Sequence, residues 1–366
     1  MSSSSSSSSS SLKKYLNVLI DGERHLTSEE AEDAFGVILS GEFDPVQVGS
    51  LLCLLRARGE TAEELAGFVR AMNGACRSVV LEEKALDIVG TGGDGADTIN
   101  ISTASVVLAA ACGCTVAKAG NRSVSSACGS ADVLEQLGVQ VDLSPTEVEE
   151  CVKECGIAFM FAPVNHPAMK YVAPIRGSLQ IRTVFNILGP MTNAAQASRT
   201  VIGVFHPHLQ PLMAQALQKV GRVDHAVIIH GVGLDEISPL GPATIVEIIN
   251  TAAAGVTPKV YKQQTIILDP LKDFNIPRCD LIDLKGGNPQ QNKQEFIDVL
   301  LPGQHTNAKR DSIILNAGLG LYVYGLTPTI AEGVKLARTT LQSGKAQQKL
   351  QHWINVSQNI RNNNNK

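Results

Sequence analysis

Four glycines lie within six residues after a predicted strand, in the segment VGTGGDGADTINIST at 89–103. The glycines are Gly90, Gly92, Gly93 and Gly95. Glycine lets backbone N–H groups approach a ligand closely, and the polar residues that follow stand where a helix is predicted to begin, an end that favours an anion. These polar residues are Asn100, Ser102 and Thr103. The pattern predicts a phosphate-binding loop, the alternative being a tight strand-to-helix turn with a polar cap.

The same glycines also match the G-x-G-x-x-G fingerprint of dinucleotide-binding folds. That fingerprint requires a helix that opens at the last glycine and an acidic residue about 20 positions later. Here residues 97–100 separate Gly95 from the predicted helix, and the next strand ends on Lys118 instead of an acid. The context therefore disfavours a dinucleotide site.

A second polar loop follows the next predicted strand, in KAGNRSVSSACGSADVLEQLG at 118–138. Lys118 and Arg122 supply cations. The neutral donors are Asn121, Ser123, Ser125, Ser126 and Ser130. Because α/β proteins bind ligands at the carboxyl ends of their strands, the loop predicts a second anion site beside the first. A solvated serine-rich loop is the alternative, whereas two phosphate loops imply a ligand with phosphates at both ends.

Two further segments carry candidate side chains. Asp235 and Glu236 are adjacent after a predicted strand, and paired acids beside phosphate loops favour Mg²⁺, the alternative being an exposed acidic turn. The segment 162–193 holds His166, Lys170, Arg176 and Arg182. One of its arginines is suited to a substrate carboxylate, although a structural arginine and a hydrogen-bonded loop histidine explain these residues equally well.

The elements that position these loops alternate between strands and helices. Runs of strand length occur at 85–89, 114–120, 157–163, 200–205 and 225–231. Helical patterns lie between them at 130–138, 144–156 and 209–221, and again near the end of the chain. This alternation predicts an α/β fold with a mostly parallel central sheet.

The first part of the chain carries helix signals only. Thr27 with Glu30 and Thr61 with Glu64 form capping boxes, and Pro45 opens another helix. We predict a small all-helical domain at 12–81, completed by helices near 173–193. The remaining predicted parts are an α/β domain at 82–172 and 194–357, a disordered serine run at 1–11 and a disordered tail at 358–366.

The composition limits the classes of function. The 366 residues carry a net charge of −4 and only 4% aromatic residues, which disfavours nucleic acid as a partner, and no apolar run is long enough for a membrane anchor. Eight cysteines occur without a C-x-x-C pair, so we interpret them as thiols in a reducing compartment.

Four segments, in their order along the chain, resemble the anthranilate phosphoribosyltransferase family. They span 87–103, 118–138, 161–193 and 230–238. The resemblance implies the nucleoside phosphorylase-like phosphoribosyltransferase fold, and a homodimer paired through the helical domains. It also implies transfer of the phosphoribosyl group of phosphoribosyl pyrophosphate (PRPP) to the amine of anthranilate, a step of tryptophan biosynthesis.

The family's binding residues carry over to matching positions, with no residue assigned as an acid or base. For PRPP they are Gly90, Thr91, Gly92, Gly93, Asp94, Thr98, Asn100, Ser102, Thr103, Lys118, Gly120, Asn121, Arg122, Ser123, Ser125, Ser126 and Ser130. For anthranilate they are Gly90, Asn121, His166 and Arg176, with Arg176 as the partner of the carboxylate. For two Mg²⁺ ions they are Ser102, Asp235 and Glu236.

The second loop departs from the usual family pattern. Ala119 stands where many members have histidine, and Ala127 and Cys128 replace a frequent Lys-Ser pair. Together with 276–284 and 354–360 these departures look like the plant form, which implies a plastid location, and otherwise a cytoplasmic one. Two rivals remain, a nucleoside phosphorylase and a nucleic-acid binder of the same fold with a degenerate metal site. The retained acid pair and the negative net charge argue against the binder.

Overall fold

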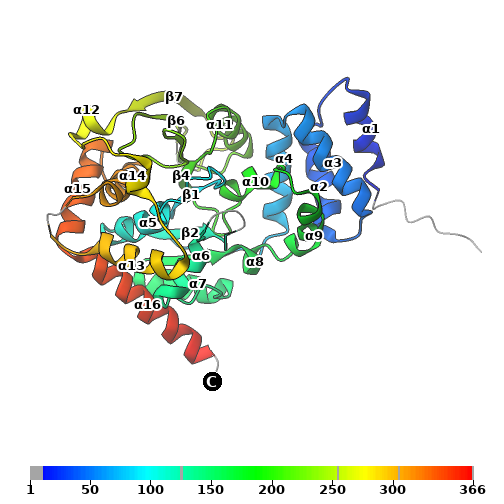
Figure 1. The fold of residues 1–366 in the computed structure, drawn as a ribbon. Helices are drawn as coiled ribbons and strands as arrows, with labels where there is room; N and C mark the ends of the chain where they lie inside the picture. Colours follow the sequence, from blue (N-terminus) through cyan, green and yellow to red (C-terminus); the bar gives the residue numbers. More distant parts are fainter. Residues whose placement is uncertain (1–10, 124–126, 254, 304–305, 365–366) are drawn as a thin grey trace, which may run out of the picture.

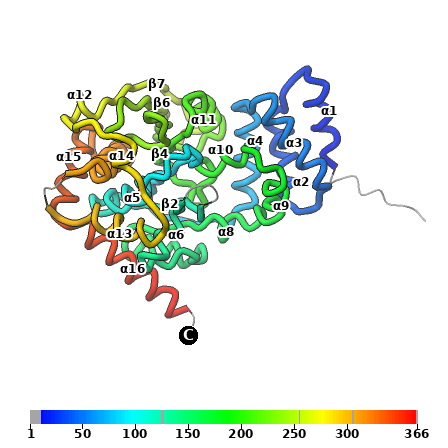
Figure 2. The backbone as a smooth tube through the Cα atoms, in the orientation of Figure 1, coloured from blue at the N-terminus to red at the C-terminus, as the bar shows by residue number. Residues whose placement is uncertain are grey.

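The computed structural model describes residues 11–123, 127–253, 255–303 and 306–364, in a helical part and an α/β part (Figure 1). The helical part contains α1 (Lys13–Asp21), α2 (Ser28–Ser40), α3 (Pro45–Arg58), α4 (Ala62–Gly74), α9 (Met169–Leu179) and α10 (Phe185–Leu188). Figure 2 shows the chain leaving the α/β part after α8 (Ala162–Asn165), passing through α9 and returning through α10. The helical part is therefore built from two separate stretches of sequence.

Local signals start these helices where the sequence predicts them. Thr27 and Thr61 each accept a hydrogen bond from the backbone three residues on, within complete capping boxes. Asp44 caps α3 ahead of Pro45, whose missing N–H costs nothing in the first turn.

A single seven-stranded sheet forms the centre of the α/β part. Its strands are β1 (Leu86–Gly90), β2 (Val116–Gly120), β3 (Ile157–Phe161), β4 (Arg199–Gly203), β5 (His225–His230), β6 (Ala243–Asn250) and β7 (Tyr261–Leu268). Their order across the sheet is β3-β2-β1-β4-β5-β6-β7, with β1 to β5 parallel and the last two strands antiparallel. The predicted α/β fold with a mostly parallel sheet is confirmed, while the sequence analysis missed the antiparallel pair.

Helices and short turns complete this part. They are α5 (Ile101–Ala111), α6 (Ser130–Leu137), α7 (Pro145–Cys155), α11 (Leu209–Val220), α12 (Pro270–Phe274), α13 (Pro289–Leu300), α14 (Ala308–Tyr324), α15 (Ile330–Gln342) and α16 (Lys345–Asn364), with 3₁₀ turns at Gly189–Met191 and Leu281–Leu284. None of the helices in the described residues is long and apolar enough to cross a membrane. All eight cysteines are free.

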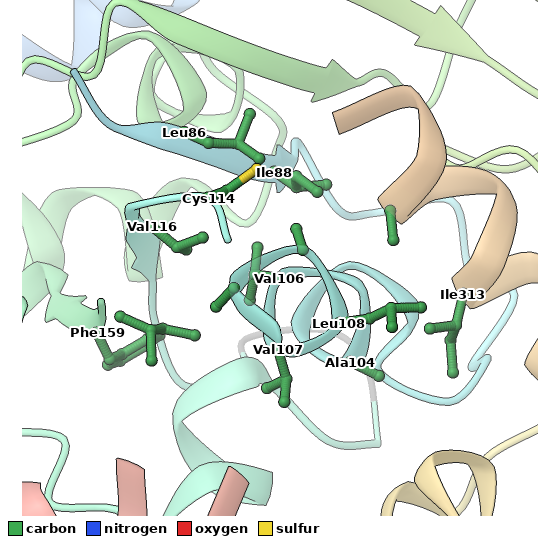
Figure 3. Close-up of a cluster of buried hydrophobic side chains, with 14 of the residues drawn as sticks. Leu86, Ile88, Ala104, Val106, Val107, Leu108, Cys114, Val116, Phe159 and Ile313 are labelled. Atoms are coloured by element: carbon green, nitrogen blue, oxygen red, sulfur yellow. The ribbon is translucent and has the colours of Figure 1, made fainter. Parts of the chain in front are cut away.

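Apolar side chains pack on both faces of the sheet. Successive strand residues point to opposite faces, so Val201 joins one core and Ile202 the other. Figure 3 shows Val106 and Leu108 of α5 in the first core, with Leu108 beside Ile313 of α14 and Ile88 of β1 in the same cluster. The second core continues without a break from β4, β5 and α11 into α1–α4 and α9–α10. Shared packing therefore holds the helical part against the sheet.

The end of the chain differs from the prediction. Residues 358–364, predicted as a disordered tail, continue α16, with Ile360 buried. Arg361 donates to Asp142 over 2.7 Å, and Asn364 donates to Glu147 over 3.0 Å. The polar composition of the tail conceals these partners because they lie more than 200 residues away. The last two residues, and the serine run up to residue 10, lie outside the described residues.

Candidate active site

The candidate site lies where the direction of strand addition reverses. From β1 the chain proceeds outward through β2 and β3, then returns to place β4 on the other side of β1. Such switch points open a crevice at the carboxyl ends of the strands, where α/β proteins bind ligands. A cavity of about 900 Å³ occupies this position and is lined by residues of both the helical and the α/β parts.

The glycine loop follows β1 and forms one wall of the cavity. Gly92 and Gly93 have φ values of 63° and 78°, a region that other residues rarely adopt. A side chain at Gly90 would place its Cβ only 2.3 Å from Oδ2 of Asp235. Glycine at these positions therefore allows the loop to curl against the acid that follows β5.

Three carboxylates converge beside this loop. One oxygen each of Asp94, Asp235 and Glu236 lies within 4.8 Å of the others. Gly92 donates its backbone N–H to Oδ2 of Asp235 over 2.8 Å. Oε2 of Glu236 is buried and, among the described residues, has no hydrogen-bond partner. Hard cations such as Mg²⁺ prefer clustered carboxylate oxygens, so these residues fit the predicted magnesium site and add Asp94 to its acidic pair.

The electrostatics of the cluster agree with that fit. Burial, followed by the charge of Asp235, raises the pKa of Asp94 and raises that of Glu236 well above its ordinary value. Ionising several neighbouring carboxyl groups away from water costs free energy, because their negative charges repel one another. A bound divalent cation would offset that repulsion.

Lys118 is a buried cation that interacts electrostatically with the acids. Its Nζ donates to the carbonyl oxygen of Ile88 over 2.8 Å, and burial lowers its pKa against the opposing charges of Asp87 and the acid pair. Asp87 is buried beside it, and burial raises the pKa of Asp87 to about 6. Lys118 therefore compensates part of the negative charge of the acids from the buried side of the two loops.

The second loop is tied to its own helix. Arg122 forms ion pairs with Glu135 and Asp132, so its charge is already neutralised by acids of α6. Asn121 accepts the Ser130 hydroxyl at its backbone carbonyl over 3.2 Å. Asn100 joins the two loops by donating from its side chain to the carbonyl of Cys128 over 3.0 Å. Both loops thus form one wall, although Ser125 and Ser126 lie outside the described residues.

The opposite wall comes from the segment between α8 and α10. Arg176 lies half-buried over the ring of Phe185, and burial lowers its pKa without any charged neighbour among the described residues. His166 has its Nε2 2.8 Å from the carbonyl oxygen of Thr192, so this nitrogen carries the proton and Nδ1 is left as an acceptor. Burial also lowers the pKa of His166, which favours the neutral ring.

A second arginine of this wall is already engaged. Arg182 donates to the carbonyl oxygen of Gly93, and its guanidinium carbon lies 4.2 Å from the ring centre of Phe205. These contacts join the returning segment to the glycine loop. Arg176 is therefore the arginine of this segment that is better placed to receive a carboxylate.

The cavity gathers the site residues predicted from the sequence, apart from the two serines that are not described. Those that line it are Gly90, Thr91, Gly92, Gly93, Asp94, Thr98, Asn100, Ser102, Thr103, Lys118, Gly120, Asn121, Arg122, Ser123, Ser130, His166, Arg176, Asp235 and Glu236. Apolar side chains, including Phe185 and Phe205, line it as well. The sequence analysis did not anticipate this apolar part, which has the character required for an aromatic ligand.

Comparison with known proteins agrees with this geometry. Residues 82–347 match the model of the glycosyl transferase family a/b domain, and residues 13–76 match that of its helical bundle domain. Anthranilate phosphoribosyltransferase of Chlamydia felis is 41% identical over 350 residues, covering 96% of this chain and 98% of the relative. The chain belongs to the anthranilate phosphoribosyltransferase family. It is therefore a glycosyltransferase, as the sequence predicts.

Solved structures of this family share the fold closely. The Thermus thermophilus enzyme superposes with a TM-score of 0.85 at 40% identity, covering 94% of this chain and 99% of the other. The Saccharomyces cerevisiae enzyme in complex with PRPP and Mg gives 0.84 at 27% identity, covering 95% and 98%. The yeast enzyme has also been solved in complex with 4-fluoroanthranilate. The glycine loop, the acid cluster and Arg176 thus occur in a chain whose relatives bind such ligands.

Proposed function

We propose that this chain transfers the phosphoribosyl group of PRPP to the amine of anthranilate, giving N-(5-phosphoribosyl)anthranilate and pyrophosphate. The observation that supports this reaction most directly is the composition of one cavity. A three-carboxylate cluster shares it with the half-buried Arg176, and within the described part of the chain neither Oε2 of Glu236 nor this guanidinium has a hydrogen-bond partner of its own. One end suits a metal-bound pyrophosphate and the other an aromatic carboxylate.

The phosphates of PRPP are assigned to the two loops. Residues Gly90 to Asp94 and the start of α5 line the cavity, where the free N–H groups and the dipole of the helix N-terminus favour anions. The described residues of the second loop, 118–123 and 127–130, extend the same wall. This division supports the binding residues expected from the sequence.

Mg²⁺ is assigned to the acid cluster. Asp235, Glu236 and Asp94 would hold it, with Ser102 as the further oxygen ligand expected from the family pattern, and we expect two ions. When bound with PRPP, Mg²⁺ neutralises charge that develops on the leaving pyrophosphate.

Anthranilate is assigned to the apolar end of the cavity. Arg176 would bind its carboxylate through the guanidinium, and Nδ1 of His166 is an acceptor suited to the aromatic amine. Asn121 and Gly90 would complete the contacts on the side of the phosphate loops.

The protein's own contribution to catalysis is positioning and electrostatics. The anthranilate amine is neutral at pH 7, so it attacks the anomeric carbon without prior loss of a proton, and the cavity needs chiefly to aim it. We expect inversion at that carbon without a strong general base. Lys118 and the helix N-terminus at Asn100 stabilise the departing negative charge from the protein side.

Two other expectations stay predictions. A homodimer paired through the helical parts follows from the resemblance to the family. The plastid location follows from the plant-like segments, and a cytoplasmic one is the alternative. Size-exclusion chromatography with light scattering tests the dimer, and imaging of the tagged full chain in its source cells tests the location.

The loss of anthranilate fluorescence tests the reaction. We expect the signal to fall only when protein, PRPP and Mg²⁺ are all present, and EDTA to stop the fall. Phosphorolysis of thymidine is the matched assay for the rival nucleoside phosphorylase. A folded protein that consumes no anthranilate would refute the proposed acceptor.

Comparing the two arginines tests the assignment of the carboxylate. Arg176→Gln should raise the KM for anthranilate by about 30-fold, because a charge-assisted hydrogen bond contributes about 2 kcal/mol. Arg182→Gln should instead act on PRPP, since that guanidinium contacts Gly93 of the phosphate loop. If Arg182→Gln raised the KM for anthranilate and Arg176→Gln did not, the carboxylate would be assigned to Arg182.

A further inference from the structure

A buried asparagine holds the backbone directly after the acid pair. Asn316 lies in α14 with none of its surface exposed. Its Nδ2 donates to the carbonyl oxygen of Ile237 over 2.7 Å, and its Oδ1 accepts the N–H of the same residue over 3.1 Å. One side chain thus satisfies both polar backbone groups of the residue that follows Glu236.

These two bonds leave the amide a single orientation. Nδ2 also donates to the carbonyl oxygen of Ser312, one turn earlier in α14, over 2.8 Å. The amide NH₂ group of Asn316 must therefore face the two carbonyl oxygens, and its amide oxygen must face the N–H of Ile237. Ile237 is itself buried in the main core, where an unpaired backbone group would be costly.

Close packing confines the rest of the acidic loop. A Cβ on Gly203 would lie 1.6 Å from the carbonyl oxygen of Asp235, and one on Gly231 would lie 2.2 Å from that of Glu236. The backbone of Asp235 and Glu236 is thus packed directly against the ends of β4 and β5. Asn316, 79 residues further along the chain, restrains the backbone at Ile237, where the chain leaves the loop.

We propose that Asn316 is a positioning residue for the divalent cation, acting through Ile237 to fix the carboxylate of Glu236. The proposal rests on the proposed function only in assigning the acid cluster to the cation. Groups that hydrogen-bond to a metal ligand and orient it typically contribute a factor of about 10 to 100 in metal affinity, and we expect the same range for Asn316, which acts through the adjacent residue. An asparagine that served folding alone would affect the stability of the protein and leave the affinity of the folded form unchanged.

Asn316→Leu is the main variant, because leucine keeps a similar volume and removes all three hydrogen bonds. Asn316→Asp is the second, since it retains an acceptor for the Ile237 N–H and loses the amide donors. Ser312→Ala is the matched control, because this buried hydroxyl on the same helix donates to the carbonyl oxygen of Ala308 and to no other described residue. Thermal unfolding reports the cost in stability of each change.

Mn²⁺ binding to the full-length protein, followed by electron paramagnetic resonance of the free ion, measures the cluster without PRPP or turnover. Mn²⁺ prefers the same oxygen ligands as Mg²⁺. We expect Asn316→Leu to raise the Kd for Mn²⁺ by about 10- to 100-fold, Asn316→Asp to raise it less, and Ser312→Ala to leave it unchanged.

Two outcomes would overturn the proposal. One is wild-type Mn²⁺ affinity in a folded Asn316→Leu protein, or in Asn316→Asp if the leucine variant does not fold. The other is a wild-type protein that binds no Mn²⁺. A wild-type protein that binds Mn²⁺ but consumes no anthranilate would contradict the proposed function alone, and the Kd values would still decide the role of Asn316.

Discussion

Asn292 donates a hydrogen bond from its side-chain Nδ2 to Oδ1 of Asn100, with 3.0 Å between the two atoms. Oδ1 of Asn292 accepts the backbone N–H of Gly287 over 2.7 Å, so its amide cannot turn over. Asn100 in turn donates to the carbonyl of Cys128. A chain of amides therefore runs from α13 through the start of α5 to the second loop, which begins after β2.

We predict that Asn292→Leu weakens the binding of PRPP by releasing the Asn100 side chain. Losing one buried hydrogen bond costs about 1.4 kcal/mol, which corresponds to a rise of about tenfold in the KM for PRPP. The KM for anthranilate should change much less, because Arg176 and His166 lie on the opposite wall. Steady-state kinetics with each substrate varied in turn would show the difference.

Gln294→Leu is the control for this prediction. Gln294 lies on the same helix and is exposed, and its one side-chain bond among the described residues goes to Asp298 within α13. An equal rise in the KM for PRPP in both variants would assign the effect to α13 as a whole rather than to the amide chain.

Removing one acid of the cluster should lower the activity of the enzyme but raise its stability in the absence of Mg²⁺. In Glu236→Gln we expect activity to fall by about 100-fold, because the variant loses a ligand for the ion that stabilises the leaving group. Without Mg²⁺ the variant should be more stable than the wild type. Its gain should grow with pH, since a carboxyl group whose pKa is raised by folding makes stability fall as pH rises.

Thermal unfolding with EDTA and with Mg²⁺ measures the predicted change in stability. Mg²⁺ should raise the Tm of the wild type and have little effect on Glu236→Gln. If EDTA leaves the variant less stable than the wild type at every pH, folding does not raise the pKa of Glu236 in the way that its burial and the charge of Asp235 require.

The sequence predicts the elements whose signals are local. Thr27 and Pro45 start their helices through contacts within four residues, and the five parallel strands are apolar runs bounded by turns. The sequence does not reveal strand β7, because its residues 262–265 (KQQT) are polar and exposed at the sheet edge, and only pairing with β6 makes them a strand. Its structure depends on a partner strand and not on its own pattern.

The site divides in the same way. The glycine loop and the pair Asp235–Glu236 are each visible as contiguous residues. Asp94 enters the acid cluster only because β1 and β5 deliver their following loops to one edge of the sheet. The pairing of Arg122 with Glu135 depends on how the second loop folds onto α6, which residue types and spacing do not specify.

Buried Asp87 should give the protein a measurable pH dependence. Its ordinary pKa of 3.8 is raised to about 6 by burial, against the charge of Lys118 and the bond from Asn193. Between these values the folded state binds the proton more tightly than the unfolded state, so the free energy of unfolding falls as pH rises. The loss amounts to about 3 kcal/mol and is complete above pH 6 to 7, roughly where the folded carboxyl is fully ionised.

Urea unfolding of the wild type and Asp87→Asn from about pH 4 to 7 tests this dependence. The variant lacks the titrating group, so the stability difference between the two proteins should shift in its favour by about 3 kcal/mol as pH rises. Asp33→Asn, at an exposed position of α2, controls for the loss of one negative charge. Parallel curves for the wild type and Asp87→Asn would mean that Asp87 titrates alike in both states.

Deleting residues 358–366 should destabilise the protein and leave its chemistry intact. The deletion exposes the site of buried Ile360 and removes the bonds of Arg361 and Asn364 to the segment around α7, a loss of about 3 kcal/mol. Ile360→Ala in the full chain should account for most of it, and Arg361→Ala for about 1 kcal/mol, because that ion pair is partly solvated. The urea midpoint should fall in that order, while kcat measured well below the unfolding temperature stays at the wild-type value. A deletion that unfolds at the wild-type midpoint would mean that the last turns of α16 contribute nothing to the fold.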